Sequence, residues 1–235
     1  MCQLTKTYAE TQDKLPQTFC ESSQKYKEES AGFLGKGGEL LFDQIDAMQA
    51  MEKYYSYHLD PGYKLTQDWQ TWCTWREKMG QWNYNVADHF HFNREIVSHS
   101  MKLVDRYIEA KGLGSHEDFQ LLSMTALYLV IKVSQKSAVA PKTFAELSRG
   151  LFQPEDIENM ERKLLDELKY KINPPLEMHY LKKLKLLLFN IEKDVKQEIF
   201  EKVRFLIEYS ITDSYFIGKK NIVCGFFSFN CYGRP

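Results

Sequence analysis

The residue whose setting most clearly suggests chemistry is Lys132, near the end of the apolar stretch 119–135, which reads FQLLSMTALYLVIKVSQ. A lysine in such a run must extend its ammonium group to water or meet an acceptor, because a buried unpaired charge is costly. A second charge, Glu161, interrupts the apolar flank of a later stretch directly after Met160. Lys132 therefore either reaches water or pairs with an acceptor, and its position makes it the starting point for the question of function.

The chain carries no recognised motif for chemistry of its own. The patterns G-x-x-x-x-G-K-[ST], G-x-G-x-x-G, H-E-x-x-H and G-x-S-x-G are all missing from the sequence. His89 and His91 could be read as a metal pair, but side chains two residues apart on a helix point in different directions. No cysteine joins them at ligand spacing. We therefore expect no enzymatic activity, no metal site and no cofactor.

Composition limits the classes of partner. The 235 residues suit one domain, or one domain plus a fragment, and apolar residues make up 43% of them. The net charge of −1 argues against a general polyanion binder, so no nucleic acid is predicted. No apolar signal segment or membrane span is recognisable, and the five cysteines are scattered, as in an intracellular protein with reduced thiols. The prediction is a protein of the nucleus, the cytoplasm or both, with no membrane partner.

The apolar stretch 119–135 also indicates what must surround Lys132. Its apolar groups cover the full circumference of a helix, so other elements must enclose it. It is too short to span a bilayer, which needs roughly 20 apolar residues. The small residues Ser123, Thr125 and Ala126 would let neighbouring helices approach its first half closely. The sequence therefore predicts a cluster of helices around this segment.

Helical periodicity recurs along the chain, and no segment shows the period-two alternation of a strand. Five helices are predicted between Thr66 and Ile172, with one ahead of them and more helices after the break at Pro174 and Pro175. The fold class is therefore all-α. The predicted helices span residues 39–58, 66–89, 92–111, 119–135, 143–151, 154 to about 168, 179–189 and 195–211.

A stripe of large side chains at spacings of 3, 4, 3 and 4 lies on the second predicted helix. It is formed by Trp72, Trp75, Met79, Trp82 and Val86. Several tryptophans on one stripe are more than a core usually takes, because indole N–H groups need acceptors. The stripe is interpreted either as core or in part as a surface groove.

Arg76 falls within the stripe, and Asp105 borders the apolar face of the third predicted helix. A carboxylate in that position needs a cationic partner, because an unpaired charge there would be costly. Arg76 on the neighbouring helix is the candidate for that partner.

The motifs now assembled resemble the cyclin box. Residues 75–82, WREKMGQW, resemble the family's M-R-x-x-L-x-D-W, and residues 103–107, LVDRY, resemble its Y-x-D-R-F. Residues 119–132 resemble L-Q-L-x-x-x-A-A-x-L-x-x-S-K, and residues 160–170 resemble M-E-x-x-[IV]-L-x-x-L-x-[FW]. Residues 174–181 resemble the P-T-x-x-x-F-L that links the two halves of such proteins. The pieces occur in order and in register with the five predicted helices, which makes the combination specific.

The resemblance implies a function and roles for individual residues. The first of two five-helix folds in this family clamps the regulatory helix of a cyclin-dependent protein kinase, so this chain is expected to bind and activate such a kinase in cell-cycle control. Lys132 and Glu161 match the kinase-contacting pair. Arg76 and Asp105 match an internal, structural ion pair. A shallow groove for short linear motifs of substrates or inhibitors would be formed by Trp75, Met79, Trp82 and Gln120.

Some positions depart from the family pattern. Its methionine is Trp75 here and its aspartate is Gln81, which bears on the motifs that the groove accepts. The two acids that often follow the lysine are Ser134 and Gln135, which bears on the choice of partner. Only 60 residues follow Pro175, enough for about three or four helices with their loops.

The expected organisation is a disordered polar tail over residues 1–38, a cyclin box over 39–175 and a truncated second cyclin-like fold over 176–235. Within that last part, Phe226, Phe227 and Phe229 are interpreted as core residues whose cover is missing. Two other interpretations stay open. One is a cyclin-fold transcription module that reads DNA, and the other is a divergent cyclin that binds a kinase without activating it.

Overall fold

The computed structural model of the protein describes residues 36–55, 67–112, 114–134, 139–188 and 191–217. Every regular element in these ranges is a helix, so the expected all-α class is confirmed. The elements are α3 (Lys36–Tyr55), α4 (Gln67–His89), α5 (Glu95–Lys111), α6 (His116–Ser134), α7 (Pro141–Leu147), α8 (Pro154–Glu167), α9 (Glu177–Leu187), α10 (Lys193–Thr212) and the 3-10 helix η2 (Ser214–Phe216). The predicted tail up to residue 35 and the aromatic run 226–229 lie outside the described residues.

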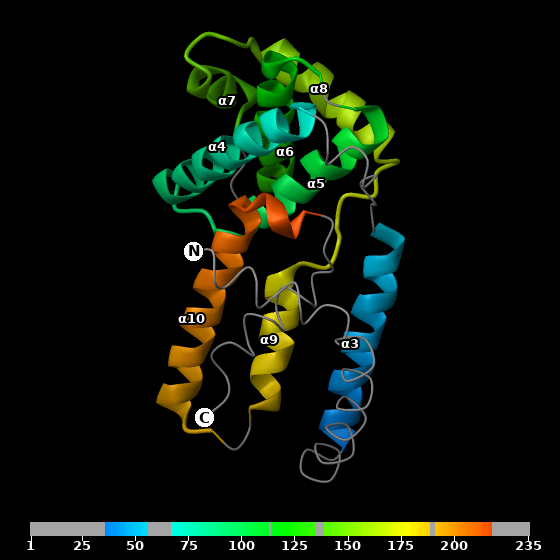
Figure 1. Cartoon of the computed structure of the whole chain (residues 1–235), viewed down its shortest axis with the longest axis vertical. Helices are drawn as coiled ribbons and strands as arrows, with labels where there is room; N and C mark the ends of the chain where they lie inside the picture. Colours follow the sequence, from blue (N-terminus) through cyan, green and yellow to red (C-terminus); the bar gives the residue numbers. More distant parts are fainter. Residues whose placement is uncertain (1–35, 56–66, 113, 135–138, 189–190, 218–235) are drawn as a thin grey trace. The chain divides into compact units, whose positions relative to one another are not determined.

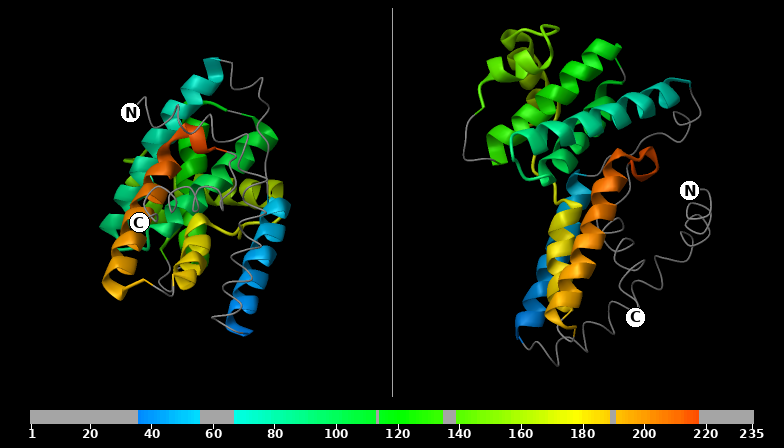
Figure 2. Two further views of the ribbon diagram at one scale, coloured as in Figure 1. Left: turned by 60° about the horizontal axis from the view of Figure 1, so that its bottom comes forward. Right: turned by 90° about the vertical axis from the view of Figure 1, so that its left-hand side faces the viewer.

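The chain divides into two compact units, Met1–Met48 and Gln49–Pro235. The described part of the first unit is the beginning of α3, which starts at Lys36, three residues before the expected position. In the second unit, helices α4 to α8 form one cluster, and α9 and α10 lie side by side, running in opposite directions (Figures 1 and 2). The five helices predicted between Thr66 and Ile172 are therefore present.

Helix α6 occupies the centre of the five-helix cluster, as its apolar circumference predicts. Its residues from Leu122 to Ile131 are all buried, and it contacts α4, α5, α7 and α8. The small residues Ser123, Thr125 and Ala126 have no exposed surface, which allows neighbouring helices to approach closely. Lys132 directly follows this buried run, where α6 reaches solvent.

Local hydrogen bonds set the helix ends and explain two differences from the sequence-based bounds. The Asn93 side chain accepts the Glu95 backbone N–H at 3.0 Å, and α5 begins at Glu95, three residues after the predicted start. Helix α7 ends at Leu147 rather than at residue 151. There the Ser148 hydroxyl donates to the Ala145 carbonyl at 2.6 Å and accepts the Phe152 N–H at 3.0 Å. This side-chain bonding offers the backbone an alternative to a further helical turn.

Helix α10 is held against the five-helix cluster by a close approach to α4. A Cβ atom added at Gly80 would lie 3.0 Å from Thr212 Cγ2, at the C-terminal end of α10. The Tyr84 hydroxyl donates to the Glu208 carbonyl at 3.0 Å, and α10 also contacts α5. The two halves of this unit therefore share a packed junction.

Candidate functional site

Lys132 at the end of α6 and Glu161 on α8 form an ion pair that is open to solvent. The Lys132 Nζ lies 2.8 Å from Glu161 Oε1 and 3.2 Å from Oε2. The lysine side chain is 53% exposed and the glutamate side chain 11% exposed. The hydrogen bond to Glu161 raises the pKa of Lys132 above its usual value, so the ammonium form is favoured. The structure thus brings together the two residues expected to contact a partner.

The surroundings of this pair suit binding rather than catalysis. The Tyr128 ring lies under the ammonium, with Nζ 5.6 Å from the ring centroid. Three large apolar side chains on or beside the same helices are exposed to solvent, namely Val133, Leu151 and Tyr170. Val133 follows Lys132 on α6, so a hydrogen-bond donor and an acceptor lie beside an exposed apolar side chain.

Tyr170 follows α8 in a backbone conformation that few residues adopt. Lys169 and Tyr170 both have positive φ angles, of 51° and 59°. Non-glycine residues rarely occupy this region, and two in succession end the helix sharply. The turn leaves the Tyr170 side chain exposed at the surface.

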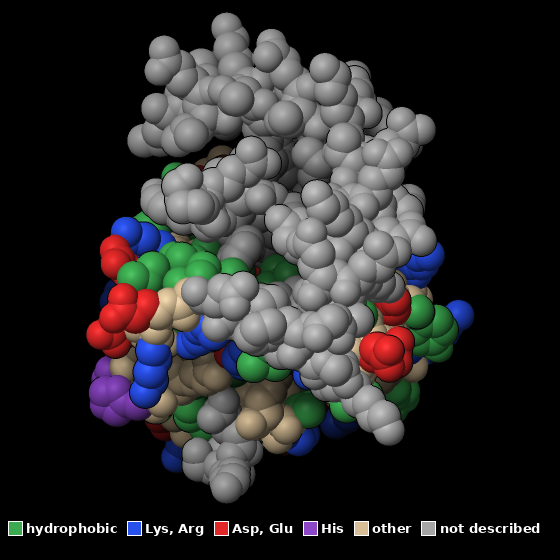
Figure 3. Space-filling view, turned by 90° about the horizontal axis from the view of Figure 1, so that it is seen from below, with side chains coloured by type: hydrophobic (Ala, Val, Ile, Leu, Met, Phe, Trp, Pro, Cys, Tyr) green, Lys and Arg blue, Asp and Glu red, His purple; other side chains and the backbone are tan. Residues whose placement is uncertain are grey.

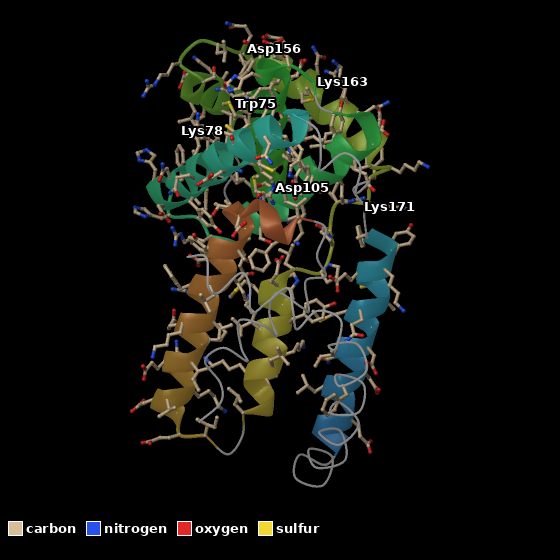
Figure 4. All side chains as sticks on the ribbon, in the orientation of Figure 1. Trp75, Lys78, Asp105, Asp156, Lys163 and Lys171 are labelled. Carbon is tan, nitrogen blue, oxygen red and sulfur yellow. The ribbon has the colours of Figure 1, made fainter. Side chains whose placement is uncertain are left out.

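Arg76 on α4 and Asp105 on α5 form a second ion pair, and this one is buried. Arg76 Nε and Nη2 donate to the two Asp105 carboxylate oxygens at 2.8 and 3.0 Å. The same guanidinium donates from Nη1 to the Ile211 carbonyl of α10 at 2.6 Å. Figure 4 shows Asp105 inside the helix cluster, where α10 reaches it. A bidentate pair with a third bond at this depth fixes three helices relative to one another.

The residues expected to form a motif-docking groove lie on α4 and α6 and are half-buried. Trp75, Met79 and Trp82 pack against the core with part of their surface exposed, and Gln120 has similar exposure. The Trp75 ring lies 5.8 Å from the Phe119 ring of α6, measured between centroids. The other members of the stripe, Trp72 and Val86, are buried. The stripe is thus divided between core and surface.

A third charged cluster was not anticipated from the sequence. Glu177, in the first turn of α9, is buried and accepts bonds from Lys102 Nζ at 2.7 Å and from Ser98 Oγ at 2.7 Å. Burial opposes its ionisation, but the charge of Lys102 and these hydrogen bonds outweigh burial and lower the pKa of Glu177. An acid just after two prolines reads as an ordinary helix start, so no sequence signal marks Glu177 as buried.

Within the ranges given above, no three His, Cys, Asp or Glu side chains gather closely enough to hold a metal ion. None of the described helices is long and apolar enough to cross a membrane. Along the left edge of the face drawn in Figure 3, basic and acidic side chains lie next to one another.

The fold and the site together define an all-α scaffold that presents a lysine and a glutamate side by side at its surface. Residues 43–173 match the family model described as "Cyclin, N-terminal domain". The chain belongs to the cyclin family.

Relatives within the family are distant. The chain is 26% identical over 171 residues to the G2/mitotic-specific cyclin cig1 of Schizosaccharomyces pombe, covering 73% of this chain and 39% of that protein. It is 26% identical over 132 residues to human G2/mitotic-specific cyclin-B2, covering 56% of this chain and 32% of that protein. The chain thus spans about two fifths or less of the length of these relatives.

A solved structure has the same fold. The X-ray structure of a viral cyclin from herpesvirus saimiri superposes with a TM-score of 0.63 at 15% identity, over 82% of this chain and 80% of that one. The likeness supports the arrangement of helices described above.

Proposed function

We propose that this protein is a regulatory subunit that binds and activates a cyclin-dependent serine/threonine protein kinase. The observation that carries the proposal is the ion pair between the half-exposed Lys132 and the largely buried Glu161, inside the segment that matches the cyclin family. The kinase would supply the chemistry, and this chain would contribute a binding surface in the nucleus, the cytoplasm or both.

The pair has the features that a contact with a kinase helix requires. An ammonium donor and a carboxylate acceptor side by side can bond main-chain groups of the partner that apolar contact leaves unsatisfied. Because the Lys132 side chain is 53% exposed, a partner can reach it without unfolding either helix. The exposed side chain of Val133, next to Lys132 on α6, would supply apolar area beside this polar centre, and those of Leu151 and Tyr170 would add apolar area at the two ends of α8.

Activation would follow from preferential binding to one conformation of the kinase. The kinase is active when a glutamate of its regulatory helix meets the lysine that holds the ATP phosphates. A cyclin that binds this arrangement more tightly than the inactive one shifts the population toward it.

The proposal is tested by measuring affinity for a cyclin-dependent kinase captured from cell extract by this protein and then purified. Lys132→Ala and Glu161→Ala should each weaken binding by about 2 kcal/mol or more, roughly thirtyfold. Arg162→Ala is the matched control, because Arg162 follows Glu161 on α8 and its side chain is 70% exposed. Unchanged affinity in both single variants and in the double variant would remove the mechanism.

Binding and activation are separated by an assay of kinase activity with the purified pair. A stoichiometric complex whose phosphorylation rate equals that of the free kinase would identify a cyclin that binds without activating. Activation is supported if the phosphorylation rate rises in proportion to complex formation. In Lys132→Ala the rate should then fall together with the affinity.

We also propose that Trp75, Met79, Trp82 and Gln120 receive short linear motifs of substrates or inhibitors. The partial exposure of these side chains across α4 and α6 supports the proposal. Met79→Asp should reduce phosphorylation of motif-bearing substrates and leave the rate on a short peptide without such a motif unchanged. Equal loss on both substrates would show that Met79 acts through folding alone.

A further inference from the structure

A cleft of about 670 Å³ lies where the α4–α5 turn meets α9 and α10. Its volume falls in the range of roughly 300–1,000 Å³ that is typical of binding sites, which often form at junctions between folds. Neither the Lys132–Glu161 pair nor the Trp75 stripe lines it. It is therefore separate from both sites proposed above.

The floor of the cleft is apolar. Five large apolar side chains line it, of which three are buried and two are half-buried: Met178, Ile207, Ile211, Phe92 and Phe200. They come from the α4–α5 turn, from α9 and from α10. Filling such a floor with an apolar side chain would remove further apolar area from water, which favours docking.

The rim of the cleft is lined by charged side chains that form ion pairs with one another. Three cations and three acids line it: Arg94, Lys182, Arg204, Asp88, Glu95 and Glu208. Each is paired within the rim, with Arg94 bonded to Asp88 at 3.0 Å, Lys182 to Glu95 at 2.5 Å and Arg204 near Glu208 at 3.7 Å. Arg94 also reaches Glu208, which joins two of these pairs. A charged ligand would have to displace one of these partners, whereas an uncharged apolar ligand would not.

The described chain ends next to this cleft. Phe216 of η2 lines a small cavity of about 20 Å³ together with Ser98 and Ile211, and both of these residues also line the large cleft. Ile217, the next residue, is buried. Residues 218–235 follow Ile217 in the chain, and 18 residues can extend as far as about 60 Å. The length of this segment therefore allows it to enter any part of the cleft.

The composition of the following segment matches the cleft. Residues 221–233 read NIVCGFFSFNCYG and contain no charged side chain, so they can enter without displacing a rim ion pair. Phe226, Phe227 and Phe229 provide aromatic groups for the apolar floor. We propose that residues 221–233 of this same chain occupy the cleft, with the run Phe226–Phe229 as its anchor.

This proposal does not depend on kinase binding. It makes the cleft an internal docking site that joins α9 and α10 more firmly to the five-helix cluster. An external partner would gain access to the cleft only by displacing the segment.

Photo-crosslinking of the full chain tests the proposal without a kinase. With benzoylphenylalanine in place of Phe227, irradiation should yield intramolecular crosslinks that mass spectrometry maps to Met178, Phe200 or Phe92. Phe200→Asp should abolish these crosslinks, because Phe200 lines the cleft. Phe205→Asp is the matched control on the same helix, since Phe205 is 66% exposed and does not line the cleft.

Several outcomes would overturn the proposal. Crosslinks between two chains would assign the cleft to a second copy of the protein. Crosslinks to other parts of the same chain, or the absence of any crosslink, would show that residues 221–233 do not occupy the cleft. If Phe200→Asp does not fold, hydrogen exchange gives an independent answer. Replacing Phe226, Phe227 and Phe229 by serine should raise amide exchange around Met178 about tenfold or more, and unchanged exchange contradicts the docking.

Discussion

The two ion pairs predicted from the sequence use the same chemistry in opposite settings. Each joins residues 29 positions apart on neighbouring helices, and each has a shortest N–O distance of 2.8 Å. The Arg76 and Asp105 side chains are 6% and 1% exposed, whereas those of Lys132 and Glu161 are 53% and 11% exposed. A charge pair that is fully enclosed fixes the fold, because separating it leaves a buried charge. A pair at the surface contributes little to folding and remains available to a partner.

Breaking the buried pair should have the largest effect on stability. Asp105→Ala leaves the Arg76 guanidinium buried without its carboxylate, which should lower the free energy of unfolding by about 3–5 kcal/mol. Urea unfolding followed by circular dichroism measures this change. Asp88→Ala is the control at a surface pair with Arg94, where about 1 kcal/mol or less is expected. Similar losses in the two variants would show that burial does not distinguish the pairs.

The cluster around Glu177 should have a smaller effect that depends on pH. Because the pKa of Glu177 is lower in the folded chain than in the unfolded one, folding favours its charged form. Its contribution is complete above the unfolded pKa of about 4.3 and is lost as the pH falls through that value toward the folded pKa. Glu177→Gln should therefore lower stability by about 1–3 kcal/mol at neutral pH.

Urea unfolding of the unaltered chain and of Glu177→Gln at several pH values measures the difference in their free energies of unfolding. It should shrink below about pH 4, where the unfolded carboxyl is protonated. A difference that stays constant through the acid range would show that charge on Glu177 is not the cause.

His99 should make a further, smaller contribution in a different pH window. Burial lowers the pKa of this histidine, and its Nε2 contacts the Ile172 carbonyl in the segment between α8 and α9. A lowered pKa means that folding favours the neutral ring, so stability falls as the pH drops from about 6.5. His99→Gln should flatten the dependence of stability on pH between about 6.5 and 5 by on the order of 1 kcal/mol. An unaltered profile would exclude His99 as its source.

The smallest effect on folding is expected at the exposed pair. Lys132→Ala should lower the free energy of unfolding by about 1 kcal/mol, because the Glu161 carboxylate, whose side chain is 11% exposed, loses its cation but gains water where the half-exposed lysine stood. Thermal unfolding at neutral pH measures this. Combined with a loss of kinase affinity, that result separates a binding residue from a structural one. A loss of stability as large as that of Asp105→Ala would place Lys132 among the structural residues.

Much of the fold could be predicted because the apolar pattern is strong. The stretch around Leu127 is apolar on every side, and it became the central helix of the five-helix cluster. Helix ends were less certain because they depend on single hydrogen bonds, such as those of Ser148 that end α7. The pairing of Arg76 with Asp105 could be inferred from two charges that each lie on an apolar stripe.

Other contacts could not be derived from local pattern. Lys132 and Glu161 could be paired only through resemblance to a family, since periodicity does not give the distance between two helices. Lys102 and Glu177 are separated by a long stretch of chain, and each looks like an ordinary surface charge in its own helix. The cleft was missed for the same reason, because it forms only when α9 and α10 pack beside the α4–α5 turn.

The bond from Arg76 to α10 ends on a main-chain oxygen, that of Ile211. A backbone acceptor is present whatever side chain occupies position 211, provided that the helix end keeps its shape. This attachment therefore tolerates sequence drift along α10 while it constrains position 76 strictly. Among homologues, one would expect the arginine and its aspartate to persist where the α10 residues near position 211 have diverged.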